Sequence, residues 1–215
     1  MIYRVVPAVL SLGLLAGVAC AADEPDAEPD LEREMETRKP TISLGAGVVV
    51  TSKPYEGVNA GVYPIPMFAY EGRRLYLRGV AFAYRGDWGV FGAALVTDIL
   101  GKHDGQELEL TYSKPMRWDA WSIAPAGGLR WQSRDLTDYY YGVRDGEARL
   151  PGRPAYDADG AVNPFVALRA QRPLGRKWSL LGAVQYEWFD DEISDSPIVD
   201  ESYDITVLAG VLYTF

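Results

Sequence analysis

The amino-acid sequence predicts an all-β fold, an antiparallel transmembrane β-barrel, and three observations support this prediction. Apolar and polar residues alternate with period two, as they do in strands that have two different faces. The alternating segments run for about ten residues or more, which is the length that a tilted strand needs to cross a bilayer. Aromatic residues mark the ends of these segments on their apolar face, as in the aromatic girdles at membrane interfaces.

Composition limits the classes of function. The chain has 215 residues, with 21 Lys+Arg, 30 Asp+Glu, one His and one Cys. This length fits one domain with or without a tail, and the net charge of −9 argues against nucleic-acid binding, which needs a basic face. A single Cys and a single His exclude a disulfide framework, a Cys-based zinc site and a multi-histidine metal site. We therefore expect no metal and no cofactor.

Residues 1–21 are predicted to be a signal peptide. Arg4 precedes an apolar run from Val5 to Val18, and the small residues Ala19-Cys20-Ala21 offer a cleavage site after Ala21. The apolar run is shorter than the roughly 20 residues that a transmembrane helix needs. Lipoprotein processing at Cys20 is the alternative. Export without a transmembrane helix leaves a periplasmic protein, a secreted protein or an outer-membrane barrel.

Residues 22–40 are predicted to be a disordered acidic periplasmic tail. Eight acidic residues between Asp23 and Glu36 face a single basic residue there, Arg33. Such a segment cannot bury enough apolar area to offset the entropy of ordering it. The tail is either a solvated spacer or a docking strip for a basic partner, and residues 41–215 form the barrel.

The first strands are expected at Thr41–Ser52, Gly61–Tyr70 and Leu75–Tyr84. From Ile42 onwards, apolar residues alternate mainly with small ones. Pro64 and Pro66 interrupt strand hydrogen bonding in the second strand. In the third strand the apolar face slips near Gly79. Either a bulge there or a turn at Arg78-Gly79 explains the slip, and the turn supplies a further strand.

The later strands are expected at Trp88–Asp98, Glu107–Lys114, Asp119–Ser133, Val162–Pro173, Trp178–Phe189 and Tyr203–Phe215. Alternation is clear in all but the first of these, and the pairs Trp121/Trp131 and Trp178/Trp188 sit at strand ends on the apolar face. A single-chain bacterial barrel has an even number of strands, with both chain ends in the periplasm. Because these strands make nine in all, we predict about ten strands, with eight to twelve allowed.

Short turns of such barrels face the periplasm, and long loops face outwards. Two long loops are expected, at 136–160 and 190–201. Tyr139, Tyr140 and Tyr141 open the first loop. They belong either to an interface girdle or to a contact surface for a protein partner.

Five charged residues are expected on the inner face: Glu107, Glu109, Arg130, Arg169 and Glu187. They either pair with one another and plug the lumen, because an unpaired charge in a confined site is costly, or line a narrow selective pore. Neither His103, which lies in a turn, nor the two nearby glutamates make a plausible catalytic site. No catalytic residue is therefore predicted, and the chain is not expected to be an enzyme.

The last strand carries a candidate barrel-assembly signal. A terminal aromatic residue with alternating apolar residues behind it resembles the recognition strand that the barrel-assembly machinery reads in bacterial outer-membrane barrels. The residues on that face are Val207, Ala209, Val211, Tyr213 and Phe215.

An ordered set of short motifs resembles the MltA-interacting protein family, also called MipA/OmpV. The motifs are Ser43-Leu44-Gly45-Ala46-Gly47, Pro54-Tyr55-Glu56-Gly57, Tyr63-Pro64-Ile65-Pro66, Leu75-Tyr76-Leu77-Arg78-Gly79, Tyr140-Tyr141-Gly142-Val143, Pro154-Ala155-Tyr156, Ser196-Pro197-Ile198-Val199 and Tyr213-Thr214-Phe215. They follow the family's order over the whole predicted barrel.

The resemblance implies an outer-membrane protein of a Gram-negative bacterium, in contact with lipid and lipopolysaccharide. The founding member of the family is regarded as a scaffold that joins a murein lytic transglycosylase to a murein synthase. A scaffold that docks murein-remodelling enzymes is therefore the leading functional hypothesis. A small gated pore for small solutes comes second. A surface adhesin that uses loops 136–160 and 190–201 comes third.

Overall fold

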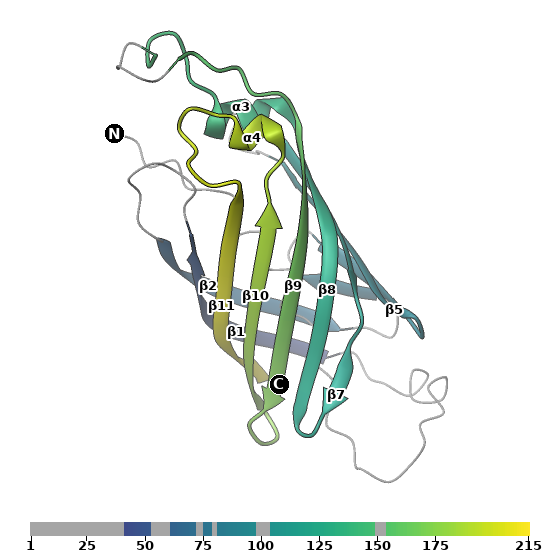
Figure 1. Cartoon of the computed structure of the whole chain (residues 1–215). Helices are drawn as coiled ribbons and strands as arrows, with labels where there is room; N and C mark the ends of the chain where they lie inside the picture. Colours follow the sequence, from purple (N-terminus) through teal and green to yellow (C-terminus); the bar gives the residue numbers. More distant parts are fainter. Residues whose placement is uncertain (1–40, 53–60, 72–74, 79–80, 98–103, 149–153) are drawn as a thin grey trace.

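The computed structural model describes residues 41–52, 61–71, 75–78, 81–97, 104–148 and 154–215 (Figure 1). The predicted signal peptide, 1–21, and the predicted acidic tail, 22–40, lie outside the described residues, as does His103. The first strand begins at Thr41, the residue at which the sequence pattern changes to period two.

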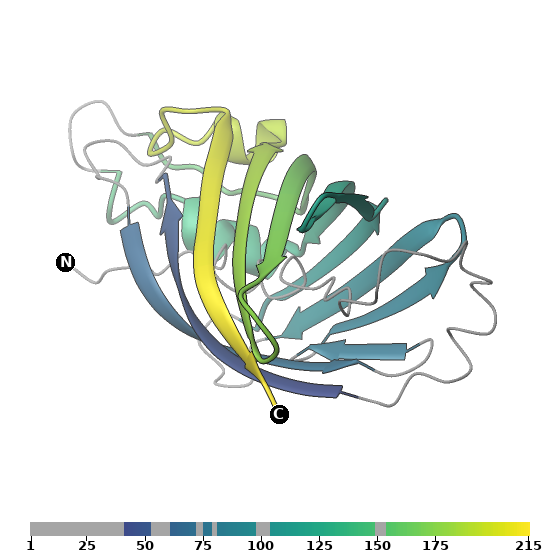
Figure 2. The ribbon, with the colours of Figure 1, turned by 90° about the horizontal axis from the view of Figure 1, so that it is seen from below.

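The described residues form one antiparallel sheet that runs around a ring. Each strand pairs with the next along the chain, except that β6 and β7 both pair with β8, and the first strand pairs with the last. The strands curve around a common axis, as the view from below shows (Figure 2). In such a ring the backbone N–H and C=O groups of strand edges pair with neighbouring strands. This pairing is needed in a bilayer because lipid offers these groups no hydrogen-bond partner. The strands are β1 (Thr41–Thr51), β2 (Gly61–Glu71), β3 (Leu75–Arg78), β4 (Ala81–Gly86), β5 (Gly89–Thr97), β6 (Gln106–Ser113), β7 (Met116–Trp118), β8 (Trp121–Gln132), β9 (Ala161–Pro173), β10 (Trp178–Trp188) and β11 (Tyr203–Thr214).

The single strand expected over Leu75–Tyr84 is two strands, β3 and β4. They pair antiparallel, with Arg78 opposite Ala81, so the chain reverses between them. A reversal restarts the alternation of faces, which accounts for the slip near Gly79 and favours the turn over the bulge. Residues 79–80 themselves lie outside the described part of the chain.

The connection between the strands expected at Glu107–Lys114 and Asp119–Ser133 also contains a strand. Met116–Trp118 forms β7, and the reversal follows at Asp119, which has a φ of 52°, a conformation that Asp tolerates better than most residues. β7 continues β6 in one register against β8, since Ser113 faces Ala126 and Met116 faces Ile123. Pro115, which has no N–H to donate, separates the two segments.

The wall is apolar outside and more polar inside. In β9, Val162, Val166 and Leu168 are exposed, whereas Asn163 and Ala167 between them are buried. The other strands with described side chains expose apolar residues in the same way, among them Leu44, Val48, Leu95, Leu110, Leu129, Leu180, Val184, Val207 and Val211. An exposed apolar band of this extent fits lipid and not water.

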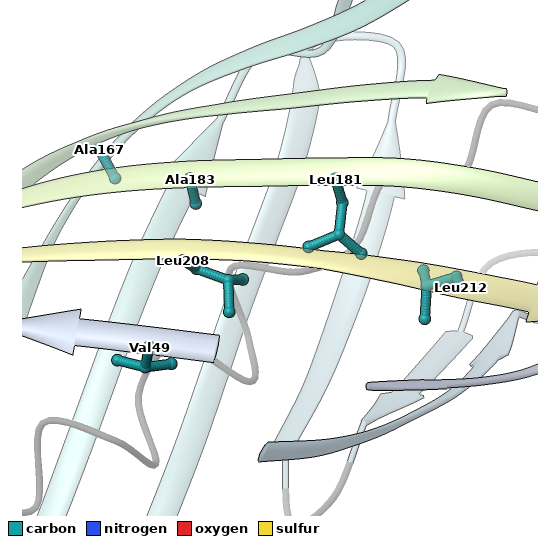
Figure 3. Close-up of a cluster of buried hydrophobic side chains, with 6 residues drawn as sticks. All are labelled: Val49, Ala167, Leu181, Ala183, Leu208 and Leu212. Atoms are coloured by element: carbon teal, nitrogen blue, oxygen red, sulfur yellow. The ribbon is translucent and has the colours of Figure 1, made fainter. Parts of the chain in front are cut away.

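A cluster of small and branched side chains fills part of the inner face. It consists of Val49, Ala167, Leu181, Ala183, Leu208 and Leu212, which come from β1, β9, β10 and β11 (Figure 3). Gly128 on β8 leaves room for a neighbouring ring, because a Cβ there would meet Phe165 and the carbonyl of Leu110. Small residues on this face therefore let the wall curve without overcrowding the interior.

The two ends of the wall differ. The lower end has short connections at 87–88, 119–120 and 174–177, and the C-terminus lies there (Figure 1). The upper end carries the two long segments predicted as loops, but each contains a helix, α3 (Arg134–Tyr141) and α4 (Asp191–Ser194). Among the described residues, no helix has the length and apolar character needed to cross a membrane.

The upper segments pack into a folded unit, which we call the cap. Its core consists of Tyr141, Ala161 and Ile193, with Tyr140, Phe189 and Val199 packed against them. A β-bridge joins Val143 to Tyr156. The Ser196 hydroxyl donates to the Tyr141 carbonyl at 2.5 Å. The helices escaped sequence reasoning because neither is long enough to show a helical repeat.

Candidate functional site

Four of the five predicted inner charges meet in one buried cluster around Arg130. The Arg130 Nη2 donates to Oε2 of Glu109 at 2.9 Å, and its Nε lies 3.5 Å from Oε1 of Glu107. Its Nη1 pairs with Oε2 of Glu187. All four side chains are at most 4% exposed. We call this set of residues the Arg130 cluster.

Strand register brings the cluster together. Glu109 on β6 lies directly opposite Arg130 on β8, and Asn163 on β9 lies opposite Arg130 on the other side. Glu187 follows from β10, and the Asn163 side-chain amide donates to it at 3.0 Å. The guanidinium also lies 5.8 Å from the centre of the Phe165 ring. Side chains of one face thus meet across neighbouring strands.

Further polar side chains complete the cluster's hydrogen bonds. Gln132 lies opposite Glu107 in the β6–β8 register, and its amide donates to that carboxylate at 3.0 Å. Gln185 donates to Glu187 at 3.3 Å. A buried charge is tolerated when it is paired and hydrogen-bonded, and these amides supply part of that support.

A second group of buried polar side chains lies around Asp204, next to the Arg130 cluster on the inner face. This residue lies opposite Glu187 in the β10–β11 register. Its carboxylate accepts hydrogen bonds from Thr51 at 3.1 Å, Ser52 at 2.7 Å and Thr206 at 2.6 Å. The inner face therefore carries two neighbouring groups of hydrogen-bonded polar side chains just below the cap, one around Arg130 and one around Asp204.

The fifth predicted charge, Arg169, is also on the inner face. It is buried on β9 and lies opposite Ala124 and Ala183 in the strand registers, closer to the lower end than Arg130 is. Sequence reasoning did not single out Gln132, Asn163 and Asp204. Period-two alternation could have identified these three residues, because each lies on the inward face of the wall with a charged neighbour.

The three tyrosines that open the first upper segment lie at the end of α3. Tyr141 is 3% exposed, and its ring packs inside the cap with Ile193 and Ala161. Tyr139 and Tyr140 are half-buried, with ring centres 5.1 Å apart. The Tyr141 ring is therefore part of the cap core, and it is available neither to a membrane interface nor to a partner.

Aromatic rings form outer groups near both ends of the wall. At the lower end, Trp88 stacks between Tyr84 and Tyr112 with ring centres 6.5 Å and 6.0 Å away. Towards the upper end, Tyr186 contacts Trp188 and Tyr203, with ring centres 4.7 Å and 5.1 Å away. This is the placement of aromatic girdles at the two interfaces of a membrane barrel.

The last strand presents the candidate barrel-assembly signal outwards. Val207, Ala209, Val211 and Phe215 are exposed on the outer face, and Tyr213 is half-buried. Trp178 lies opposite Tyr213 in the β10–β11 register, and the centres of the two rings are 5.1 Å apart. A role in assembly stays a prediction.

Within the described ranges, no group of three or more His, Cys, Asp or Glu side chains could hold a metal ion. The candidate site is the Arg130 cluster, a set of buried paired charges on the inner face of the wall. Together with an apolar outer band, two aromatic girdles and a capped upper end, this site defines the class of protein: a β-barrel that crosses an outer membrane.

Comparison with known proteins gives the family. The model of the family described as MltA-interacting protein MipA matches residues 77–215, and the chain belongs to this family. The chain is 27% identical over 223 residues to the putative outer membrane protein YiaT of Escherichia coli K12, covering 81% of this chain and 91% of that one. It is 24% identical to the MltA-interacting protein of the same organism, covering 81% and 90%.

Among solved structures, the chain is similar to a major outer membrane protein from Thermus thermophilus. The sequence identity is 15% and the TM-score 0.39, and the match covers 83% of this chain and 100% of that one. The family and the named relatives confirm the predicted barrel class and its location in the outer membrane.

Proposed function

We propose that this protein is a non-enzymatic scaffold that docks murein-remodelling enzymes, a lytic transglycosylase and a murein synthase, at the outer membrane. The observation that carries the proposal is the Arg130 cluster. The inner charges bind one another within the wall, so their chemistry is used to hold strands together. Membership of the MltA-interacting protein MipA family adds support.

The lower end is the docking surface in this proposal. Short turns and both ends of a barrel chain face the periplasm, where murein lies. At this end Arg117 on β7 and Arg176 in the turn at 174–177 are exposed. The acidic segment 22–40 precedes β1, whose first residue lies opposite Glu71 at that same end. Turns and tail together offer both signs of charge to a partner.

A crosslinking pull-down from intact envelopes tests the scaffold. The full chain is compared with a variant that lacks Asp23–Glu36 and with a variant in which the acidic residues of that segment are replaced by their amides. The amide variant keeps the length of the segment and removes its charge. All three must first show the heat-dependent gel shift of a folded barrel.

We expect the full chain to capture a lytic transglycosylase and a murein synthase. Loss of both from the two tail variants would locate docking in the acidic segment, and retention would locate it in the lower turns. If no murein enzyme is captured by any of the three proteins, the scaffold proposal is wrong.

A narrow cation-selective pore is the second candidate. It is favoured by the excess of three carboxylates over one guanidinium in the Arg130 cluster, because rings of acidic side chains select cations. Purified protein in planar bilayers should then give conductance steps whose cation selectivity falls in Glu109→Gln. Glu147→Gln in the cap, where the side chain is exposed, is the matched control. Silent bilayers exclude the pore.

A further inference from the structure

Among the described side chains, the two ends of the wall carry opposite charge. The upper segments are acidic, with Asp190, Asp191, Glu192 and Asp195 around α4 alone. Among the described side chains near the lower end, the acidic residues are Asp87 and Asp119. The basic side chains there are Arg85, Lys114, Arg117, Arg172, Arg176 and Lys177. The described side chains at the lower rim of the wall therefore favour an anionic ligand.

Lys177 joins this positive charge to the aromatic girdle. Its ammonium donates to the Tyr213 hydroxyl at 3.1 Å and lies 5.4 Å from the centre of that ring. The Trp178 and Phe215 rings both contact the Tyr213 ring, each with its centre 5.1 Å away. A cation is thus held at the rim by rings that belong to a lipid interface.

Two further cations of the lower rim contact residues of the aromatic girdle. Arg172 faces Leu180 on the outer side of the wall, and its guanidinium lies 5.7 Å from the centre of the Trp121 ring. Lys114 reaches across the turn between β4 and β5, and its ammonium lies 3.3 Å from the carbonyl of Trp88. That tryptophan stacks between two tyrosines.

We propose that Lys114, Arg172 and Lys177 form a collar that binds the phosphate groups of anionic phospholipids in the periplasmic leaflet. All three side chains are exposed. Arg172 and Lys177 each lie against a ring of the outer girdle, and Lys114 binds the backbone carbonyl of a girdle tryptophan, immediately below the apolar band that acyl chains cover. Basic residues at this depth attract anionic headgroups. The proposal needs only the barrel and its orientation, and it stands apart from the scaffold.

Lipid-protein association measured with spin-labelled lipids tests the collar. The refolded full chain is placed in phosphatidylcholine vesicles, and the association of labelled phosphatidylglycerol is compared with that of labelled phosphatidylcholine. The variant is Arg172→Gln/Lys177→Gln. The matched control, Arg134→Gln/Arg144→Gln, removes two exposed arginines at the opposite end.

We expect the wild-type protein to prefer phosphatidylglycerol, by about fivefold for each cation that a headgroup meets. The preference should fall towards unity in Arg172→Gln/Lys177→Gln and stay in the control. High salt should weaken it in the wild type, since exposed charges are screened, whereas free glycerol phosphate should compete poorly because it lacks acyl chains.

An unchanged preference in a folded variant would overturn the collar. So would a variant that keeps the lipid preference but captures less of a murein enzyme, because its cations would then belong to a protein-docking surface. The gel shift of the folded barrel is measured for every variant. Arg172→Lys/Lys177→Gln, which keeps a cation at position 172, should retain part of the preference that Arg172→Gln/Lys177→Gln loses.

Discussion

Arg130 and Glu109 lie directly opposite each other on β8 and β6, and their side chains form a buried hydrogen-bonded ion pair with 2.9 Å between Nη2 and Oε2. The guanidinium holds two further carboxylates, one from the same strand β6 and one from β10. A single inward arginine therefore links strands that are not neighbours in the wall.

Replacing Arg130 by Met should lower the free energy of unfolding by about 3–5 kcal/mol, because three buried carboxylates lose their shared cation. Urea unfolding of the barrel in phospholipid vesicles measures the loss. Arg144→Met, which removes an exposed arginine of the cap, should change the value by less than about 0.5 kcal/mol. Equal effects of the two substitutions would contradict the structural role of the cluster.

Coupling within the cluster can be isolated by a double-mutant cycle of Arg130→Met and Glu109→Gln. Because the two residues share a network, their effects should be non-additive by about 0.5–3 kcal/mol. Additive effects in urea unfolding would mean that the pair contributes little beyond its separate parts.

The cost of a charge on the outer face should depend on its depth in the membrane. Leu168, in the middle of β9, faces outwards, as does Val162 near its upper end. Leu168→Arg should destabilise the barrel in vesicles by about 2–4 kcal/mol and Val162→Arg by about 0–1 kcal/mol. Equal costs at the two positions would show that these faces do not lie at different depths in lipid.

The placement of the inner charges could be predicted from alternation alone. Glu107 and Glu109 share a face of one strand, so their common orientation follows from period two. Their meeting with Glu187 could not be predicted, because it depends on the register of β8, β9 and β10, and no sequence pattern here fixes register between strands that lie far apart in the chain.

The cap core should tolerate truncation poorly. Ile193 is fully buried with Tyr141 and Ala161, so Ile193→Ala should cost about 2–5 kcal/mol of local stability. Trypsin should then cut the cap at Arg144 at least about tenfold faster, while the heat-dependent gel shift of the barrel stays. Leu174→Ala, at an exposed position of the lower end, is the control and should leave cleavage unchanged.

Because of Tyr156, the stability of the cap is expected to fall at alkaline pH. Burial, together with the carboxylates of Glu192, Asp195, Asp190 and Asp191, raises the pKa of its phenol above the ordinary value of 10.0. The folded cap then keeps the proton where the unfolded chain has lost it. The phenol's contribution to stability is full below pH 10 and is lost as pH rises through the folded pKa.

Absorbance titration of phenolate measures this effect as the difference between the wild-type protein and Tyr156→Phe. The step assigned to Tyr156 should lie above the ordinary phenol range. The hydroxyl donates to the Glu192 carbonyl at 3.1 Å, so the variant also loses one hydrogen bond. A step at or below the ordinary range would mean that the carboxylates around α4 do not surround this ring.

The cap itself lay beyond sequence reasoning. Tyr139, Tyr140 and Tyr141 looked like a surface motif because three adjacent tyrosines are polar enough for an interface. The burial of Tyr141 follows from α3, a helix of 8 residues, which turns this ring towards Ile193 on a segment far along the chain. Contacts that depend on two short helices meeting leave no periodic signal.

The scaffold proposal is tested most directly by placing a photoreactive residue at Arg176, in the lower turn, or at Arg144, in the cap, and illuminating intact envelopes. Both positions are exposed, so neither change disturbs the wall. We expect adducts with murein enzymes from position 176 and none from position 144. Adducts from position 144 alone, or from neither position, would contradict docking at the periplasmic end.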